Sequence, residues 1–171
     1  MQLIKCTGKL QKEMGLNKSD LLQSEPDFSY LGPWHANLIY INRRKCVLFV
    51  NDKTLFNFIA PDVYREEIRN LCVLFKRHLR CVLAKEEVMA SAREKILAEY
   101  EEIGYAKTNS KSVLGSMNDI AFHYKYHIQE EGGIHSIAIP SIIKKLNHMP
   151  MGAIEYTYPI EALSAMYENA T

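Results

Sequence analysis

Residues 34–61 read WHANLIYINRRKCVLFVNDKTLFNFIAP, and this stretch decides the fold class. A tight turn is expected at residues 42–45. It follows a loosely alternating segment, Ala36–Ile41, and precedes a nearly continuous apolar run, Cys46–Val50. A second turn at Asn51-Asp52-Lys53 has residues that tolerate positive φ, and Leu55–Ile59 follows as a third strand or a short helix. We expect an antiparallel meander whose middle strand is central, because that strand is apolar on both faces.

The segments before the meander predict a short strand, a short helix and a long loop. The strand is expected at Met1–Thr7, with Thr7 as the cap of a helix that Gly15 ends. Asn17–Pro33 is punctuated by Ser, Pro and Gly, so we expect a long surface loop with a helical turn at Ser19–Leu22. Long loops of this kind are often functional.

The segments after the meander are mostly helical. Apolar residues recur at three and four positions within Asp62–Glu102, which predicts two helices that begin at an Asp62 cap and break near Ala84–Glu87. A short strand is expected at Ile103–Lys107, and the central helix at about 112–129. Gly132-Gly133 should end that helix. Beyond it we expect an extended Ile134–Ile139, a helix at Ser141–Asn147 after Pro140, a strand at Met151–Tyr158 and a helix at Ile160–Tyr167.

Together these elements predict an α+β fold: a mainly antiparallel sheet of about five or six strands, built on the central meander, with helices packed on it. The 171 residues fit a single domain, 1–171. The strand order does not follow from the pattern.

Composition indicates a cytoplasmic protein. A net charge of +1 provides no general attraction for nucleic acid. No apolar run reaches the length of a membrane span, so no membrane partner is expected. The four cysteines show no C-x-x-C spacing, and three of them lie in apolar runs, which argues against a disulfide framework or a zinc site.

Several motifs together resemble a family of small uncharacterised bacterial proteins, classed as a domain of unknown function. The resemblance covers nearly the whole chain and implies a single-domain cytosolic protein of bacterial type. It assigns no activity, cofactor or catalytic residue to the chain. The motifs that carry it are Lys5–Leu10, Trp34–Leu38, Arg43–Lys45, Phe49–Thr54, Ala106–Asp119, Pro150–Ala153 and Tyr158–Glu161.

The strongest candidate for a ligand site is Lys107–Asp119, at the start of the central helix. Small hydroxyl and amide side chains favour helix caps, and a helix N-terminus flanked by lysines suits an anion. The alternative is a well-made cap with two solvated lysines. The stretch lacks the phosphate-loop order, and Gly115 falls within the helix. The residues proposed to bind the ligand here are Lys107, Thr108, Asn109, Ser110, Lys111, Ser112, Asn118 and Asp119.

Three residues of the first meander strand complete this candidate site. His35 and Asn37 are expected to line the same pocket, and Trp34 offers a stacking surface. A Trp is more often a core anchor whose N–H is satisfied, so that alternative stays open. Whether the site is catalytic, and hence whether the protein is an enzyme, does not follow from these residues.

A metal site and a nucleic-acid site are less favoured. Asp119, His123 and His127 share one helical stripe, but the H-E-x-x-H order is absent, so we expect no metal and no cofactor. Basic residues at Arg43–Lys45 and at Lys53 lie at opposite ends of the middle strand. They form a polyanion footprint only if helical basic residues join one end: Lys76, Arg77 and Arg80.

Two functional hypotheses follow. In the first, the protein binds a small anionic ligand, a nucleotide or a phosphorylated metabolite, at the Lys107–Asp119 loop and helix N-terminus. In the second, it is an interaction module with a protein partner, as in toxin–antitoxin, phage-defence or mobile-element systems. The second rests on small size, near-neutral charge and the basic turns.

Overall fold

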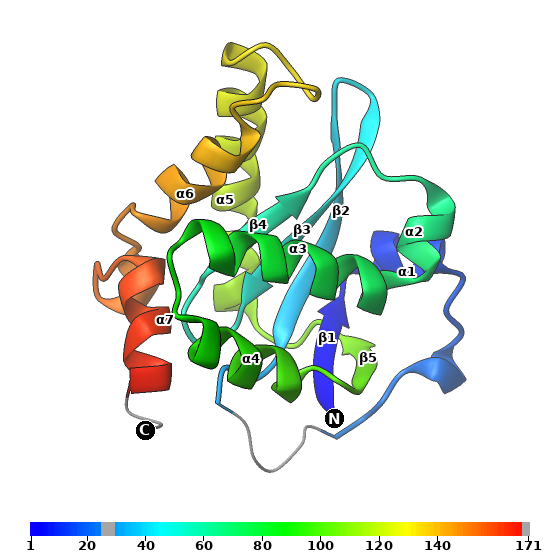
Figure 1. The fold of residues 1–171 in the computed structure, drawn as a ribbon. Helices are drawn as coiled ribbons and strands as arrows, with labels where there is room; N and C mark the ends of the chain where they lie inside the picture. Colours follow the sequence, from blue (N-terminus) through cyan, green and yellow to red (C-terminus); the bar gives the residue numbers. More distant parts are fainter. Residues whose placement is uncertain (25–29, 169–171) are drawn as a thin grey trace.

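The computed structural model describes residues 1–24 and 30–168, and these form one five-stranded sheet with helices on both faces (Figure 1). The expected loop Asn17–Pro33 therefore lies partly outside the described residues. In chain order the elements are β1 Gln2–Cys6, α1 Gly8–Met14, a 3₁₀ turn Lys18–Asp20, β2 Trp34–Ile41, β3 Arg44–Asn51, β4 Asn57–Ala60, α2 Arg65–Arg69, α3 Leu71–Lys85, α4 Ala90–Glu99, β5 Ile103–Lys107, α5 Lys111–Glu130, α6 Ile139–Asn147, a 3₁₀ turn Gly152–Ile154 and α7 Pro159–Glu168.

The strand order is β4-β3-β2-β1-β5, and the sheet is mixed. The meander is confirmed, because β2, β3 and β4 pair antiparallel. The expectation of a mainly antiparallel sheet was wrong, because β1 pairs parallel with both β2 and β5. A parallel pair requires a connection that crosses over the sheet, and the connection from β1 to β2 includes α1. The path from β1 to β5 includes the meander as well as α2, α3 and α4.

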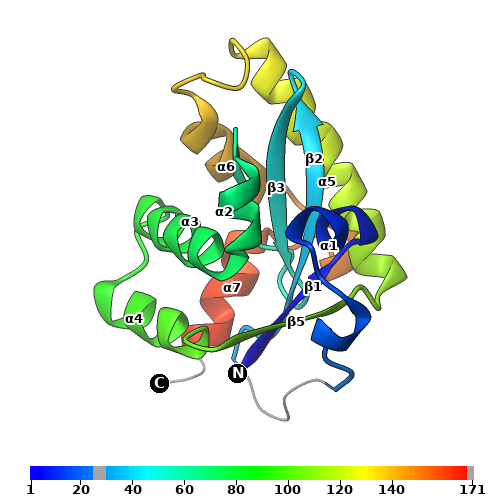
Figure 2. The same cartoon turned by 90° about the vertical axis from the view of Figure 1, so that its right-hand side faces the viewer.

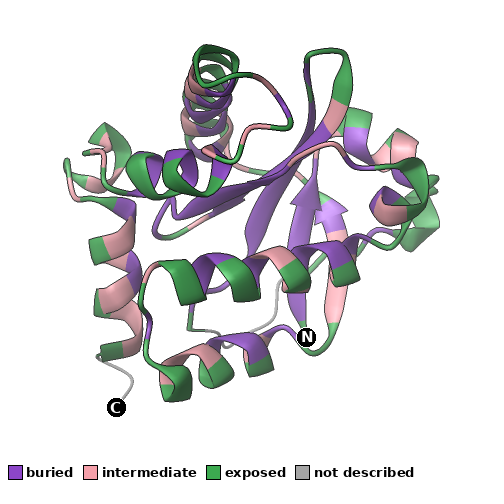
Figure 3. Ribbon diagram, turned by 45° about the horizontal axis from the view of Figure 1, so that its top comes forward, coloured by how far each residue is buried: buried purple, intermediate pink, exposed green. Residues whose placement is uncertain are grey.

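The two faces of the sheet have different covers. α3 and α4 lie on one side and α5 on the other (Figure 2). On the α3 side, the Trp34 ring meets Phe75 edge-on with centroids 5.2 Å apart, and its indole N–H donates to the Tyr100 hydroxyl at 2.9 Å. The strands are buried between these layers, while the helices keep exposed outer faces (Figure 3). The core is therefore sandwiched on both sides of the sheet.

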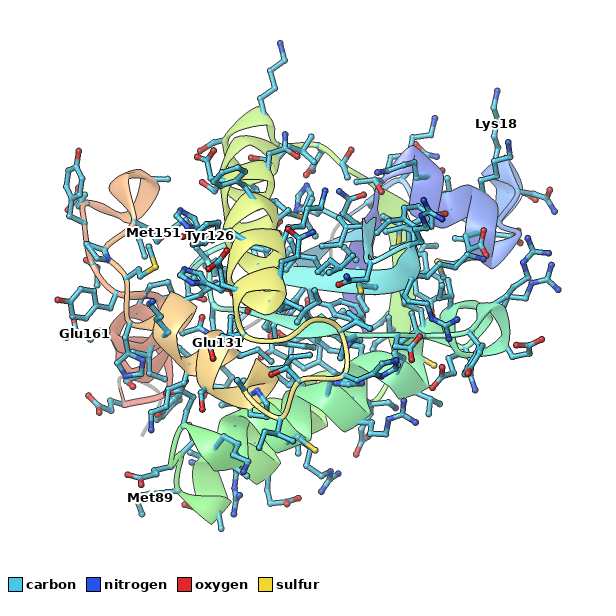
Figure 4. All side chains as sticks on the ribbon, turned by 90° about the horizontal axis from the view of Figure 1, so that it is seen from above. Lys18, Met89, Tyr126, Glu131, Met151 and Glu161 are labelled. Carbon is cyan, nitrogen blue, oxygen red and sulfur yellow. The ribbon has the colours of Figure 1, made fainter. Side chains whose placement is uncertain are left out.

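α6 covers the outer edge of β4. It lies between α5 and α3 when the molecule is seen from above (Figure 4). Asn147 accepts from the backbone N–H of Asn57 at 2.9 Å and donates to its carbonyl at 2.8 Å. The Tyr124 hydroxyl of α5 donates to the Asn57 side chain at 2.7 Å. The Asn147 side chain thus pairs with the backbone of β4 as a further strand would. This pairing protects the β4 edge from association with another strand.

Several local predictions are confirmed. The Met14-Gly15 boundary ends α1, with Gly15 at φ 74. The break after α3 begins at Glu86, and α5 starts and stops within a residue of its expected limits, with Gly132 and Gly133 at positive φ. The turn between β2 and β3 places Asn42 at φ 52 and Arg43 at φ 62, as expected for a tight hairpin turn.

Three local predictions were wrong. Asp62 does not cap a helix: it sits at φ 50 and accepts a hydrogen bond from Arg44 at 2.6 Å, and α2 begins after Tyr64. Residues 134–138 form turns instead of an extended segment, and Ile139 already begins α6. Met151–Tyr158 makes a single bridge around a 3₁₀ turn, because positive φ at Glu155 and Tyr156 folds this segment back on itself.

Candidate functional site

The connection from β5 to α5 carries the centre of the predicted site. Lys107 ends β5, three residues follow without regular structure, and Lys111 begins α5. Ser110 is the N-cap: its hydroxyl accepts from the Val113 N–H at 3.2 Å. A side chain added at Gly115 would meet no atom within 4 Å, so this glycine does not mark the close approach of another backbone. The capping function predicted for the serine is thus observed.

A pocket of about 170 Å³ lies beside this connection. Its walls come from β1, from β5 with the residues that follow it, and from the segment after the first 3₁₀ turn. Two lysines and four uncharged polar side chains face three aliphatic ones, and no carboxylate belongs to its lining among the described residues. The lining residues are Leu3, Lys5, Leu22, Gln23, Ser24, Ala106, Lys107, Thr108 and Asn109.

Lys5 brings a charged group into the interior at this pocket. Its side chain is only 5% exposed, and its ammonium donates to Asp52 Oδ2 at 2.9 Å. The other carboxylate oxygen of Asp52 lies 2.7 Å from Nδ1 of His35, whose side chain is fully buried. Lys5 pairs with His35 in the β1–β2 register, so both side chains leave the same face of the sheet. The three residues form one buried cluster, in which Asp52 is the shared acceptor.

The Asp52 carboxylate also orients the His35 ring. With the neutral imidazole, a carboxylate at 2.7 Å keeps the proton on Nδ1, which leaves Nε2 as an acceptor. Among the described residues, this buried Nε2 has no hydrogen-bond partner. A buried acceptor without a partner costs free energy, on the order of 1–3 kcal/mol. Such a group calls for a physical explanation, and a bound water or ion or a catalytic role is among the usual ones.

The other predicted residues do not gather at this pocket. Trp34 faces the opposite side of the sheet, where it is a core anchor. Asn37 is nearly buried and accepts from the Thr7 hydroxyl at 2.8 Å. Neither His35 nor Asn37 belongs to the pocket lining. Ser110 caps α5, and three further predicted residues are exposed on that helix: Lys111, Ser112 and Asn118.

Asp119 lies farther along α5, at a different hollow. It and His123 face Met149, Pro150 and Met151 across a hollow of about 270 Å³. The rings of His123 and His127 stack with centroids 6.2 Å apart. Among the described residues, no group of three His, Cys, Asp or Glu side chains is arranged to hold a metal ion.

Most of the basic turn residues are already engaged. Arg44 pairs with Asp62, and Lys45 pairs with Glu13 from α1. The Lys53 ammonium donates to the Tyr30 carbonyl at 3.1 Å. Because these partners neutralise or hold the cations, the turns do not combine into one basic patch. No helix within residues 1–24 and 30–168 is both long enough and apolar enough to cross a membrane.

Sequence reasoning missed Lys5 and Asp52 as site residues. The available signal was a lysine inside the otherwise apolar strand Leu3-Ile4-Lys5-Cys6, where a solvated charge is unexpected. Asp52 was read only as a turn residue. Its contact with Lys5 spans 47 positions and depends on β1 lying next to β2, which no local pattern contains.

The model of a family described as Domain of unknown function (DUF6933) matches residues 3–162. No curated protein sequence and no solved structure matches the chain.

Proposed function

We propose, for a chain that belongs to the DUF6933 family, that the protein binds a small anionic metabolite. The description of this family assigns no function, so the proposal is argued from the geometry of the site. The ligand would sit in the pocket formed by Lys5, Lys107, Thr108 and Asn109. One observation carries this proposal: the pocket lining combines two lysines with hydroxyl and amide groups and includes no carboxylate among the described residues. Phosphoryl and carboxylate oxygens are the natural partners of such donors.

The position of the pocket in the fold supports a ligand site. Lys5 and Lys107 lie at or near the carboxyl ends of the parallel strands β1 and β5. Open sheets with parallel strands commonly bind ligands beyond these ends, where loops lead into helices. Here the loop leads into α5, whose first turn is the positive end of a helix dipole.

Pocket size narrows the class of ligand. Pockets that enclose drug-sized molecules usually measure about 300–1,000 Å³. The observed volume of about 170 Å³ is smaller, so the pocket would enclose a phosphorylated or carboxylated metabolite of a few carbon atoms. A nucleotide would place only its phosphate there and leave the base outside. The proposal therefore favours the phosphorylated metabolite over the nucleotide.

The two lysines would have different tasks. Lys5 is held by Asp52, so it provides a fixed donor at the base of the pocket. Lys107 is exposed at the rim, so it can move to meet an incoming charge. A ligand that touches Lys5 would also alter the charge balance of the Asp52 and His35 cluster. Nothing in this arrangement requires a chemical step, and the proposal is one of binding.

The test is a binding measurement with three anions: inorganic phosphate, glycerol 3-phosphate and AMP. Calorimetry should give the tightest binding for glycerol 3-phosphate, and Lys107→Gln should weaken it about tenfold, roughly 1.4 kcal/mol. Lys111→Gln is the matched control, because this exposed lysine lies four residues on and outside the lining. If none of the anions binds, or if both variants lose affinity equally, this pocket is not an anion site.

An interaction module remains a second candidate, because α5 exposes two neighbouring aromatic rings. Phe122 is 68% exposed and Tyr126 is 53% exposed, on the helix that also carries His123. Exposed aromatic residues are enriched at protein interfaces. A pull-down with the chain should then recover a stoichiometric protein partner that Phe122→Ser with Tyr126→Ser releases and Arg43→Glu does not. Recovery unchanged by the double variant would contradict this use of α5.

A further inference from the structure

A second hollow lies away from the pocket discussed above, between α3 and α6. Its volume is about 510 Å³, which falls in the range of small-molecule sites. Aliphatic side chains from β4, α3, α6 and the turn before α6 make up much of its wall. The lining residues that matter here are Ile59, Val82, Ile134, Ile139 and Ile143, together with Glu86.

Glu86 is the unusual member of this lining. Its side chain is only 3% exposed, and its Oε1 has no hydrogen-bond partner among the described residues. Nε2 of His148, a ring that carries a charge only when it is protonated, lies 3.9 Å from the other oxygen. Burial raises the pKa of this carboxyl above its ordinary value, since a charge removed from water is disfavoured. The residue also follows the last turn of α3, where the helix dipole disfavours an acid.

The other basic groups around the hollow form no ion pair with the Glu86 carboxyl. Lys85 and Lys144 belong to the lining but are exposed, and neither forms an ion pair with Glu86. Burial lowers the pKa of His78, which favours its neutral form. His135 lies 3.7 Å from Asp62 instead. Glu86 is thus a buried acid beside an apolar hollow, and one of its two oxygens has no donor among the described residues.

We propose that this hollow binds a small amphipathic amine, with its apolar body against the aliphatic wall and its ammonium group on the Glu86 carboxylate. The ammonium would supply the hydrogen-bond donor that Oε1 lacks. The terminal torsion of a glutamate has a broad energy minimum, so a small rotation turns a carboxylate oxygen towards the hollow. Repulsion from the two lysines is screened because they are exposed to solvent.

Matched probes isolate the head group. The probes are 4-phenylbutylamine, 4-phenylbutanol and 4-phenylbutyrate, which share one apolar body. Calorimetry on the full chain should rank the amine first, at least tenfold tighter than the alcohol. Glu86→Gln should reduce the affinity for the amine to that for the alcohol, whereas Glu87→Gln, at the exposed neighbouring acid, should leave it unchanged.

A second readout keeps the test independent of the Glu86 variant. Cys81 is exposed and belongs to the lining of the hollow, so bound amine should slow its alkylation by iodoacetamide several-fold. Cys81→Trp should fill the hollow and abolish binding while the protein stays folded. Preference for 4-phenylbutyrate, absence of binding, or amine affinity unchanged in Glu86→Gln would each overturn the proposal. None of these results depends on the anion pocket over Lys5.

Discussion

Replacing Asn147 with Ala tests how α6 is held to the sheet. The side chain is fully buried and makes three hydrogen bonds: it accepts from the Asn57 N–H, and it donates to the carbonyls of Asn57 at 2.8 Å and Ile143 at 2.9 Å. In the alanine variant the N–H and carbonyl of Asn57 lose this partner inside the protein. Each unsatisfied buried group costs about 1–3 kcal/mol. We expect a total loss of about 3–5 kcal/mol, a large part of the 5–15 kcal/mol typical of a domain.

The measurement is urea unfolding followed by fluorescence of Trp34, the single tryptophan, which is fully buried. For a chain of this size the loss corresponds to roughly 6–20 °C in Tm. Tyr124→Phe is the graded control, because it removes one hydrogen bond to Asn57 and should cost only about 1 kcal/mol. If Asn147→Ala costs less than Tyr124→Phe, the described pairing of α6 with the β4 edge is not what holds this helix.

Three further predictions concern the two proposed sites and the helix that supports the first. Met117→Ala should cost about 2–5 kcal/mol and Ser110→Ala about 0.5–2 kcal/mol in urea melts, because Met117 is a core side chain and Ser110 a cap; equal losses would refute this assignment. Asp52→Asn should cost about 3–5 kcal/mol, since it removes the charge that Lys5 and His35 share in the interior; a loss below 1 kcal/mol would contradict the buried cluster. Burial raises the pKa of Glu86, so the folded protein keeps the Glu86 proton at pH values where the unfolded chain has released it. The free energy of unfolding therefore falls as the pH rises from the unfolded-state pKa to the folded-state pKa of Glu86. Glu86→Gln should stabilise the protein more at pH 7.5 than at pH 4, and an equal effect at both pH values would refute the direction of the shift.

Local patterns were enough to predict the elements whose limits depend on nearby residues. The apolar stripe that includes Met117 and Tyr124 placed α5 correctly, and the turn at Asn42 placed the hairpin. The expectation that the chain belongs to a family classed as a domain of unknown function is confirmed over residues 3–162. These features depend on short-range periodicity, on residues that tolerate positive φ, or on similarity along the whole chain.

The sheet and the site depend on contacts between distant residues, which periodicity does not contain. A strand such as Gln2–Cys6 has the same pattern at the edge of a sheet as in its centre, and the parallel pairing with β5 joins residues about a hundred positions apart. Asp62 has the composition of a helix cap, but its contact with Arg44 decides its conformation. Met151–Tyr158 alternates like a strand, yet no neighbouring strand is available to pair with it among the described residues.

The buried cluster of Lys5, Asp52 and His35 is relevant to function because a cluster of this kind contributes little to the stability of the fold. Buried ion pairs often stabilise a protein no more than well-packed apolar side chains of similar volume, since desolvation offsets the attraction between the charges. The same face of the sheet accepts aliphatic residues elsewhere, such as Val50, which pairs with His35 in β3. Stability alone therefore does not require three ionisable groups here. Lys5 is also the member of the cluster that reaches the pocket lining, beside Lys107 and Thr108. A charge that is held by Asp52 and presented to a pocket whose lining includes no carboxylate among the described residues is suited to recognising an anion, and this supports the proposed anion site at this edge of the sheet.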